Sequence, residues 1–267
     1  MTREQKVSTL IQYLKQENQA YASIPDPIDE GEQRRLLRSL MNVRYPGHAS
    51  AEYEKLQDEL LQEEAEEKGI VTCNDIPVIE QEYPCSEIKN SDRISLWRGD
   101  ITRLDVDAIV NAANSQLLGC FVPCHGCIDN AIHSAAGIQL RNECAEIMAE
   151  QGHEEPIGKA KITKGYNLPA KHVIHTVGPI VGLAVTEKQK EQLKDCYLNC
   201  LKVAEKSSLK SIAFCCISTG EFHFPNKQAA EIAVDTVDRF LTKTSIERVI
   251  FNVFKEQDFN IYKKLFC

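Results

Sequence analysis

The sequence predicts a three-layer α/β/α fold with a mixed, largely parallel central sheet, preceded by a helical N-terminal extension. From about residue 92 onward, short apolar runs alternate with helical patterns, which is typical of a sheet covered by helices. Before that point, apolar residues recur with helical spacing. A length of 267 residues suits one domain with such an extension. We therefore divide the chain into a helical lobe with a crossing segment, 1–91, and an α/β domain, 92–267.

Three helices are expected in the lobe. Thr2 and Gln5 form a potential capping box for the first helix, and the third begins at about Ser50 and ends at Gly69. The apolar faces of the three helices consist of Val7, Leu10, Ile11 and Leu14, then Leu36, Leu37, Leu40 and Met41, then Tyr53, Leu56, Leu60 and Leu61. Such short helices cannot bury these faces by themselves, so we expect the lobe to pack on the α/β domain.

Six strands and four helices are expected in the α/β domain. The strands are predicted at 93–99, 107–113, 159–166, 172–178, 211–217 and 248–254. The helices are predicted near 127–149, 187–206, 226–243 and 256–265. Ligands of such sheets bind at the carboxyl ends of the strands. The loops 99–102, 112–127 and 218–225 are therefore expected to form the site together.

The acidic excess of the chain lies entirely in its first third. Residues 1–90 hold 10 basic and 18 acidic residues, whereas residues 91–267 hold 21 of each. Neither part has the basic stripe of a nucleic-acid-binding protein, so we expect no nucleic-acid partner. An anion bound to the α/β domain would have to be held largely by backbone N–H groups.

Composition also bears on location and on cysteine chemistry. No run of about 18 apolar residues occurs, and the first residues have no signal-peptide core. We therefore expect a cytoplasmic protein with no membrane partner. We also expect a monomer. In a reducing compartment the eleven cysteines would be thiols or metal ligands. Cys215 and Cys216 lie in an apolar run and are interpreted as small buried hydrophobes.

The densest chemical signal is the segment 119–127, which contains Cys120, Cys124, His125 and Cys127. Thiolates and imidazole at this spacing suit Zn²⁺. Adjacent residues seldom reach the same small ion, so Cys124 and His125 are not both expected to be ligands. Three protein ligands and an open position are typical of a catalytic zinc. The alternatives are a closed structural zinc with Cys124 as fourth ligand, a C-x-x-C redox pair, and unrelated buried cysteines.

Two further features surround this segment. Asp129 and His133 share one face of a predicted helix. Asp129 either has a function or only stabilises the first turn of this helix through its interaction with the helix dipole. His133 is more typical of a core residue than of a catalyst. The loop 218–222 follows a strand and precedes a helix, so its backbone N–H groups can converge on a diphosphate.

Together these segments resemble a macrodomain over about residues 92–267. The similar segments are Gly99-Asp100-Ile101-Thr102, the stretch 106–114 (VDAIVNAAN), the stretch 119–137 ending in Ala-Ala-Gly, and Ser218-Thr219-Gly220. Macrodomains usually carry a glycine-rich loop after the Asn-Ala-Ala-Asn motif. Here the cysteine-containing segment 119–127 replaces it. This departure resembles the zinc-containing bacterial macrodomains, which have a similar helical extension and are described as protein-ADP-ribose hydrolases.

The resemblance assigns roles to individual residues. It implies Cys120, His125 and Cys127 as zinc ligands, and Asp129 as the catalytic acid–base residue with Asn114 positioning the ribose. The implied substrate-binding residues are Asp100 and Ile101 at the adenine, Asn111 and Asn114 at the distal ribose, Ile128 and Asp129 beside it, and Ser218, Thr219, Gly220, Glu221 and Phe222 at the diphosphate and ribose.

The expected function is a zinc-dependent hydrolase that removes ADP-ribose from modified protein side chains, with acidic residues as the expected attachment. Its partners would be ADP-ribose and ADP-ribosylated protein. Two alternatives are an ADP-ribose-binding reader module and an O-acetyl-ADP-ribose deacetylase. A reader needs no metal, so the cysteine–histidine cluster favours an enzyme.

Overall fold

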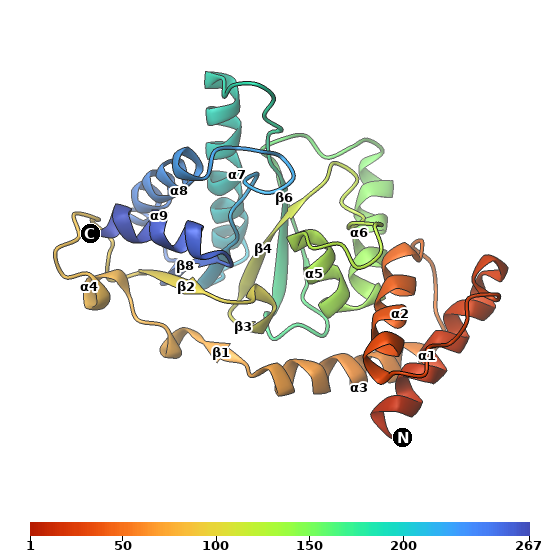
Figure 1. Cartoon of the computed structure of the whole chain (residues 1–267). Coiled ribbons are helices and arrows are strands. Elements are labelled where there is room, and N and C mark those ends of the chain that lie inside the picture. Colours follow the sequence, from red (N-terminus) through yellow and green to blue (C-terminus); the bar gives the residue numbers. More distant parts are fainter.

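A six-stranded sheet lies at the centre of the computed structural model, which describes residues 1–267 (Figure 1). Its strands are β2 (Ile94–Arg98), β4 (Ala108–Ala113), β5 (Ala160–Lys164), β6 (His172–Val177), β7 (Ser211–Phe214) and β8 (Arg248–Val253). Their order across the sheet is β2-β8-β7-β4-β6-β5, and only the β5–β6 pair is antiparallel. The central strands are almost wholly buried, as expected for parallel strands covered on both faces. The predicted mixed, largely parallel sheet is confirmed.

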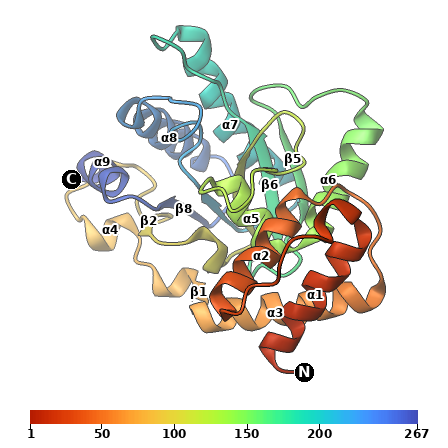
Figure 2. The same cartoon turned by 45° about the vertical axis from the view of Figure 1, so that its right-hand side comes forward.

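The helices of the α/β domain are α5 (Ile128–Ala136), α6 (Ile138–Gln151), α7 (Glu187–Lys206), α8 (Asn226–Leu241) and α9 (Glu256–Phe266). Helix α7 packs against α8 and α8 against α9, whereas α5 and α6 pack together on the side that faces the lobe (Figures 1 and 2). The prediction of a single helix near 127–149 is wrong, because Gly137 divides this segment into α5 and α6. Gly137 has a φ of 93°, and a Cβ there would lie 2.5 Å from the Gln57 amide nitrogen.

Strand β7 is also shorter than predicted. The apolar run continues to Ile217, but the strand ends at Phe214. The backbone then leaves the sheet and reaches Ser218, whose φ of 65° is unusual for a residue with a side chain. The other predicted strands and helices differ from the structure by only one or two residues at each end.

The lobe consists of α1 (Arg3–Glu17), α2 (Glu30–Val43) and α3 (Ala51–Lys68), with the short 3₁₀ turn η1 (Gln19–Tyr21). The capping box at the start of α1 is present, and Ser50 caps α3. The apolar faces of the helices form a core of eleven buried residues, which includes Ile138 from α6. The lobe therefore packs on the α/β domain, as predicted.

The segment between lobe and sheet packs as part of the α/β domain. Strand β1 (Val71–Thr72) pairs with β3 (Leu104–Asp105), and η2 (Cys73–Asp75) and α4 (Ile79–Glu82) follow it. The α/β domain has a main core of 45 buried apolar residues around the sheet, and Ile76 and Ile79 belong to it. The predicted crossing segment thus contributes to the domain that it leads into.

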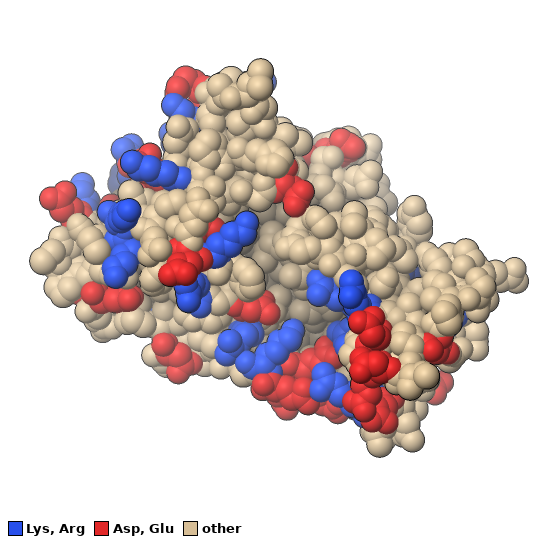
Figure 3. Space-filling model, viewed as in Figure 1, with Lys and Arg blue, Asp and Glu red and all other residues tan.

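The acidic face of the lobe is matched by basic side chains. Figure 3 shows acidic residues gathered over α3, with basic residues between them. Glu64 accepts hydrogen bonds from Arg34 at 2.5 and 2.7 Å and from Arg3 at 3.2 Å. Burial alone would raise the pKa of Glu64, but the two arginines outweigh it and hold this pKa below its usual value. None of the helices is sufficiently long and apolar to span a membrane.

Candidate functional site

Three loops meet at the carboxyl edge of the sheet, after β2, β4 and β7. The loop after β4 leads into α5, whose first turn carries Asp129. The His125 imidazole in that loop lies 3.7 Å from the Glu221 carboxylate in the loop after β7. The sheet thus brings together segments that are far apart in the sequence, as the sequence analysis predicted.

Asp129 lies beneath this edge and is almost fully buried, with 5% of its surface exposed. The Asn111 amide of β4 donates a hydrogen bond to its Oδ1 over 2.8 Å. Burial raises the pKa of Asp129 to about 6, although the Asn111 bond and the charge of Arg141 act in the opposite direction. A carboxyl group with such a pKa can exchange a proton near neutral pH.

Two buried histidines lie close to Asp129 and its partner Asn111. His133 lies one turn along α5, with Nε2 3.5 Å from Asp129 Oδ1, and burial lowers its pKa well below the usual value. His175 on β6 is paired in register with Asn111, and its Nδ1 is 3.2 Å from the Asn111 amide nitrogen. Its Nε2 lies 3.0 Å from Thr163 Oγ1. The sequence analysis missed His175, whose only signal was a histidine within an apolar strand.

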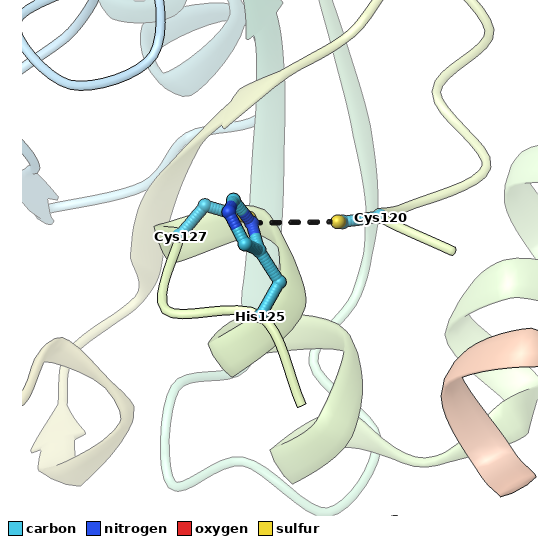
Figure 4. A group of neighbouring side chains, drawn as sticks. All are labelled: Cys120, His125 and Cys127. Atoms are coloured by element: carbon cyan, nitrogen blue, oxygen red, sulfur yellow. Dashed lines mark hydrogen bonds between the residues drawn. The ribbon is translucent and has the colours of Figure 1, made fainter. Parts of the chain in front are cut away.

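The side chains of Cys120, His125 and Cys127 converge on one another (Figure 4). Their ligand atoms all lie within 4.8 Å of one another, and Cys120 Sγ is 3.7 Å from His125 Nδ1. Two thiols and one imidazole form a donor set that fits Zn²⁺. Burial raises the pKa of the Cys127 thiol to about 12, so a bound cation would have to stabilise its thiolate.

Cys124 lies outside this group. Its thiol donates to the Arg35 carbonyl of the lobe over 3.5 Å, and its backbone has a φ of 52°. Because the thiol is directed to the lobe, the structure does not place it as a fourth ligand beside Cys127. This geometry does not support the closed four-ligand site or the C-x-x-C redox pair.

The loop after β7 presents unpaired backbone donors. The N–H groups of Gly220, Glu221 and Phe222 have no acceptor in the structure. Ser218 and His223, at either end, both have positive φ, a strained conformation that is common at binding sites. The loop contains no lysine or arginine, so consecutive N–H groups are its means of holding an anion.

The loop after β2 contains Asp100 and Ile101. Asp100 Oδ1 accepts hydrogen bonds from the backbone N–H and hydroxyl of Thr102, at 3.0 and 2.7 Å, whereas its second carboxylate oxygen has no partner. The Ile101 side chain is buried in the main core, so only its backbone can face a ligand.

Phe254 lies at the end of the strand next to β2 and was missed by the sequence analysis. It directly follows β8, the strand next to β2, and 77% of its surface is exposed. The Gly99 N–H donates to the Val253 carbonyl over 3.0 Å, which joins the two loops. The sequence did contain a signal for this residue. The apolar run 248–254 ends in Phe254, one residue beyond the end of β8, so this aromatic side chain falls in the loop after the strand.

Asn114 and Ile128, two of the predicted site residues, make contacts within the protein. The Asn114 amide donates to the Gly119 carbonyl over 3.1 Å, and its oxygen accepts from the Gln116 N–H over 3.0 Å. Asn114 therefore shapes the start of the cysteine-containing loop. Ile128 is the first residue of α5 and packs, half-buried, against the main core.

A layered α/β domain with these loops at one sheet edge defines a macrodomain, and the Macro domain sequence profile matches residues 110–233. The chain belongs to the macrodomain family. Within it, the chain is 52% identical to a protein-ADP-ribose hydrolase of Treponema medium, over 99% of both chains. It is 50% identical to a protein-ADP-ribose hydrolase of Staphylococcus aureus (strain MRSA252), over 86% of this chain and 84% of that one.

A solved structure shows the same fold. The Trypanosoma brucei macrodomain in complex with ADP-ribose superposes with a TM-score of 0.66 and 30% identity. The match covers 85% of this chain and 94% of that one. The coverage extends the likeness beyond residues 92–267 into the lobe.

Proposed function

We propose that this chain is a zinc-dependent protein-ADP-ribose hydrolase that releases ADP-ribose from acidic side chains of modified proteins. The observation that carries the proposal is the position of buried Asp129 in the first turn of α5, two residues after Cys127 of the Cys120/His125/Cys127 group. The names of the two bacterial relatives support the same activity. A module that only binds ADP-ribose would need neither the carboxyl group nor the metal ligands.

Binding of ADP-ribose uses groups that have no partner in the structure. The free carboxylate oxygen of Asp100 would accept from the adenine amino group, and exposed Phe254 would stack on the base. The diphosphate would accept from the N–H groups of Gly220, Glu221 and Phe222. Backbone N–H groups carry no net charge. An anion site built from them is consistent with a domain, 91–267, that has no excess of basic residues.

The reaction replaces the bond between the distal ribose and a protein carboxyl group by a bond to water. Asp129 would accept a proton from the attacking water, and Asn111 would hold the carboxylate in place. Zinc held by Cys120, His125 and Cys127 would supply a Lewis acid at this position. The products are free ADP-ribose and the restored side-chain carboxyl group.

The decisive experiment measures release of labelled ADP-ribose from automodified protein, with and without a zinc chelator. We expect release that stops on chelation and returns when zinc is added back. Binding without release would identify a reader module, and release from O-acetyl-ADP-ribose alone would identify a deacetylase. Comparison of substrates modified on glutamate with those modified on arginine tests the proposed linkage.

A further inference from the structure

Helix α2 of the lobe lies directly against the loop that carries the proposed metal ligands. Both views show α2 beside α5, the helix that this loop leads into (Figures 1 and 2). The lobe residues involved precede the loop by more than eighty positions in the sequence. Their contacts are therefore tertiary, and no local spacing in the loop accounts for them.

Asn42 makes the shortest hydrogen bond from α2 to the loop, and the Arg38 guanidinium also donates to the His125 carbonyl over 3.4 Å. Asn42 is buried, with 1% of its surface exposed, and its Oδ1 accepts the Cys124 N–H over 2.9 Å. Its amide nitrogen donates to Ser134 Oγ of α5 over 2.9 Å. Because Cys124 has a positive φ, its backbone conformation is costly without such a partner. Asn42 thus fixes the Pro123–Cys124 peptide, one residue before His125.

Arg38, one turn earlier on α2, holds the other side of the loop. Its guanidinium donates to Asn130 Oδ1 over 2.7 Å. The Asn130 amide in turn donates to the Val122 carbonyl over 3.0 Å. Together with Asn42, this chain of bonds fixes the backbone on both sides of Pro123, between Cys120 and His125.

We propose that α2 is a positioning element of the Cys120/His125/Cys127 site, and that Asn42 is its principal residue. The lobe is then a part of the reaction centre and not only a stabilising extension. The inference rests on the proposed function in so far as it concerns the metal. Groups that orient metal ligands from outside typically change metal affinity by about 10–100-fold when they are removed.

The test compares Asn42→Leu with the matched variant Gln57→Leu. Gln57 is a second buried lobe amide, which accepts the Ile138 N–H over 3.1 Å and donates to Gln139 over 2.7 Å without touching the loop. In competition with a chromogenic chelator, we expect Asn42→Leu to raise the Kd for zinc about 10–100-fold. Gln57→Leu should remain near wild type. Equal weakening in both variants, or none in Asn42→Leu, would overturn the proposal.

A second measurement does not depend on the metal. In zinc-free protein, maleimide labelling mapped by mass spectrometry should modify Cys124 faster in Asn42→Leu than in wild type or Gln57→Leu. Unchanged labelling would overturn the positioning role. If wild type takes up no zinc but Cys124 is still labelled faster in Asn42→Leu, the metal assignment fails and the positioning role stands. Arg38→Gln tests the same loop through Asn130 should Asn42→Leu not fold.

Discussion

Asn111 donates a hydrogen bond to the Asp129 carboxylate over 2.8 Å, from a side chain that is completely buried. The same amide nitrogen lies 3.2 Å from His175 Nδ1 on the neighbouring strand. The carboxylate is therefore held by the sheet itself, through adjacent strands in fixed register. A rigid support of this kind favours a carboxyl group that keeps one orientation during a reaction.

Replacement of Asp129 should separate catalysis from binding. We expect Asp129→Ala to lower the hydrolysis rate by about 10²–10⁴-fold, because the proton acceptor is lost. Its zinc content and ADP-ribose affinity should remain near wild type, since neither the proposed metal ligands nor the 218–222 loop is altered. Asp235→Ala, which removes an exposed carboxylate paired with Arg239, is the control. A wild-type rate in Asp129→Ala would contradict the proposed role.

The proposed metal site makes a stoichiometric prediction. Elemental analysis should find one zinc per chain, and His125→Ala should reduce both this content and hydrolysis, because only two thiols remain as ligands. The control is His153→Ala, which removes an exposed histidine outside the site. A full zinc content in His125→Ala would exclude this imidazole as a ligand.

Asp100 has both a structural and a proposed binding role, and two substitutions distinguish them. Asp100→Ala should weaken ADP-ribose binding by about 1.5–3 kcal/mol, the usual contribution of a charge-assisted hydrogen bond. It should also destabilise the fold, because the bonds to Thr102 are lost. Asp100→Asn can keep those bonds and should lose affinity alone. Titration calorimetry with unchanged affinity in both variants would remove Asp100 from the adenine site.

Features of the fold that depend on local spacing were predictable from the sequence. Thr2 and Gln5 predicted the capping box of α1, and Ser50 and Gly69 predicted the ends of α3. The break at Gly137 was missed, although a glycine is the same signal that predicted the end of α3, because the helical pattern continues across it. Gln57 of the lobe, which accepts the Ile138 N–H over 3.1 Å at the start of α6, is a partner that only the tertiary structure brings near.

The candidate site divides in the same way. The spacing of Cys120, His125 and Cys127 predicted that they would converge, because the loop is short. The direction of the Cys124 thiol depends on the Arg35 carbonyl of α2, which only the tertiary structure brings near. His175 was missed for the same reason, since its pairing with Asn111 requires the register of two strands that are remote in sequence.

The lobe should be inseparable from the α/β domain. Its core includes Ile138 of α6, and removal of residues 1–69 would expose this apolar side chain of the α/β domain to water. We expect limited proteolysis of the folded chain to release no stable fragment of 92–267, and a truncated chain to aggregate or unfold at lower temperature. A truncated chain with wild-type thermal stability and activity would identify the lobe as an independent module.

The buried histidines should make the fold sensitive to acid. Burial lowers the pKa of His175 to about 3, so His175 remains neutral in the folded state, whereas an unfolded histidine takes up a proton near pH 6.5. Between these two values the unfolded state binds more protons. The free energy of unfolding therefore falls as the pH falls, by about 1.4 kcal/mol per pH unit for this residue.

The variant His175→Gln isolates this contribution. Its amide cannot be protonated, but it can still face Asn111 and Thr163, the hydrogen-bonding neighbours of the imidazole. Between pH 7.5 and pH 5.0, the wild type should lose about 2 kcal/mol more stability than the variant. Denaturant unfolding at both pH values measures this difference, and exposed His153→Gln should show the wild-type dependence. Parallel curves for wild type and His175→Gln would mean that His175 takes up its proton at the same pH in the folded and unfolded states, and would contradict the lowered pKa.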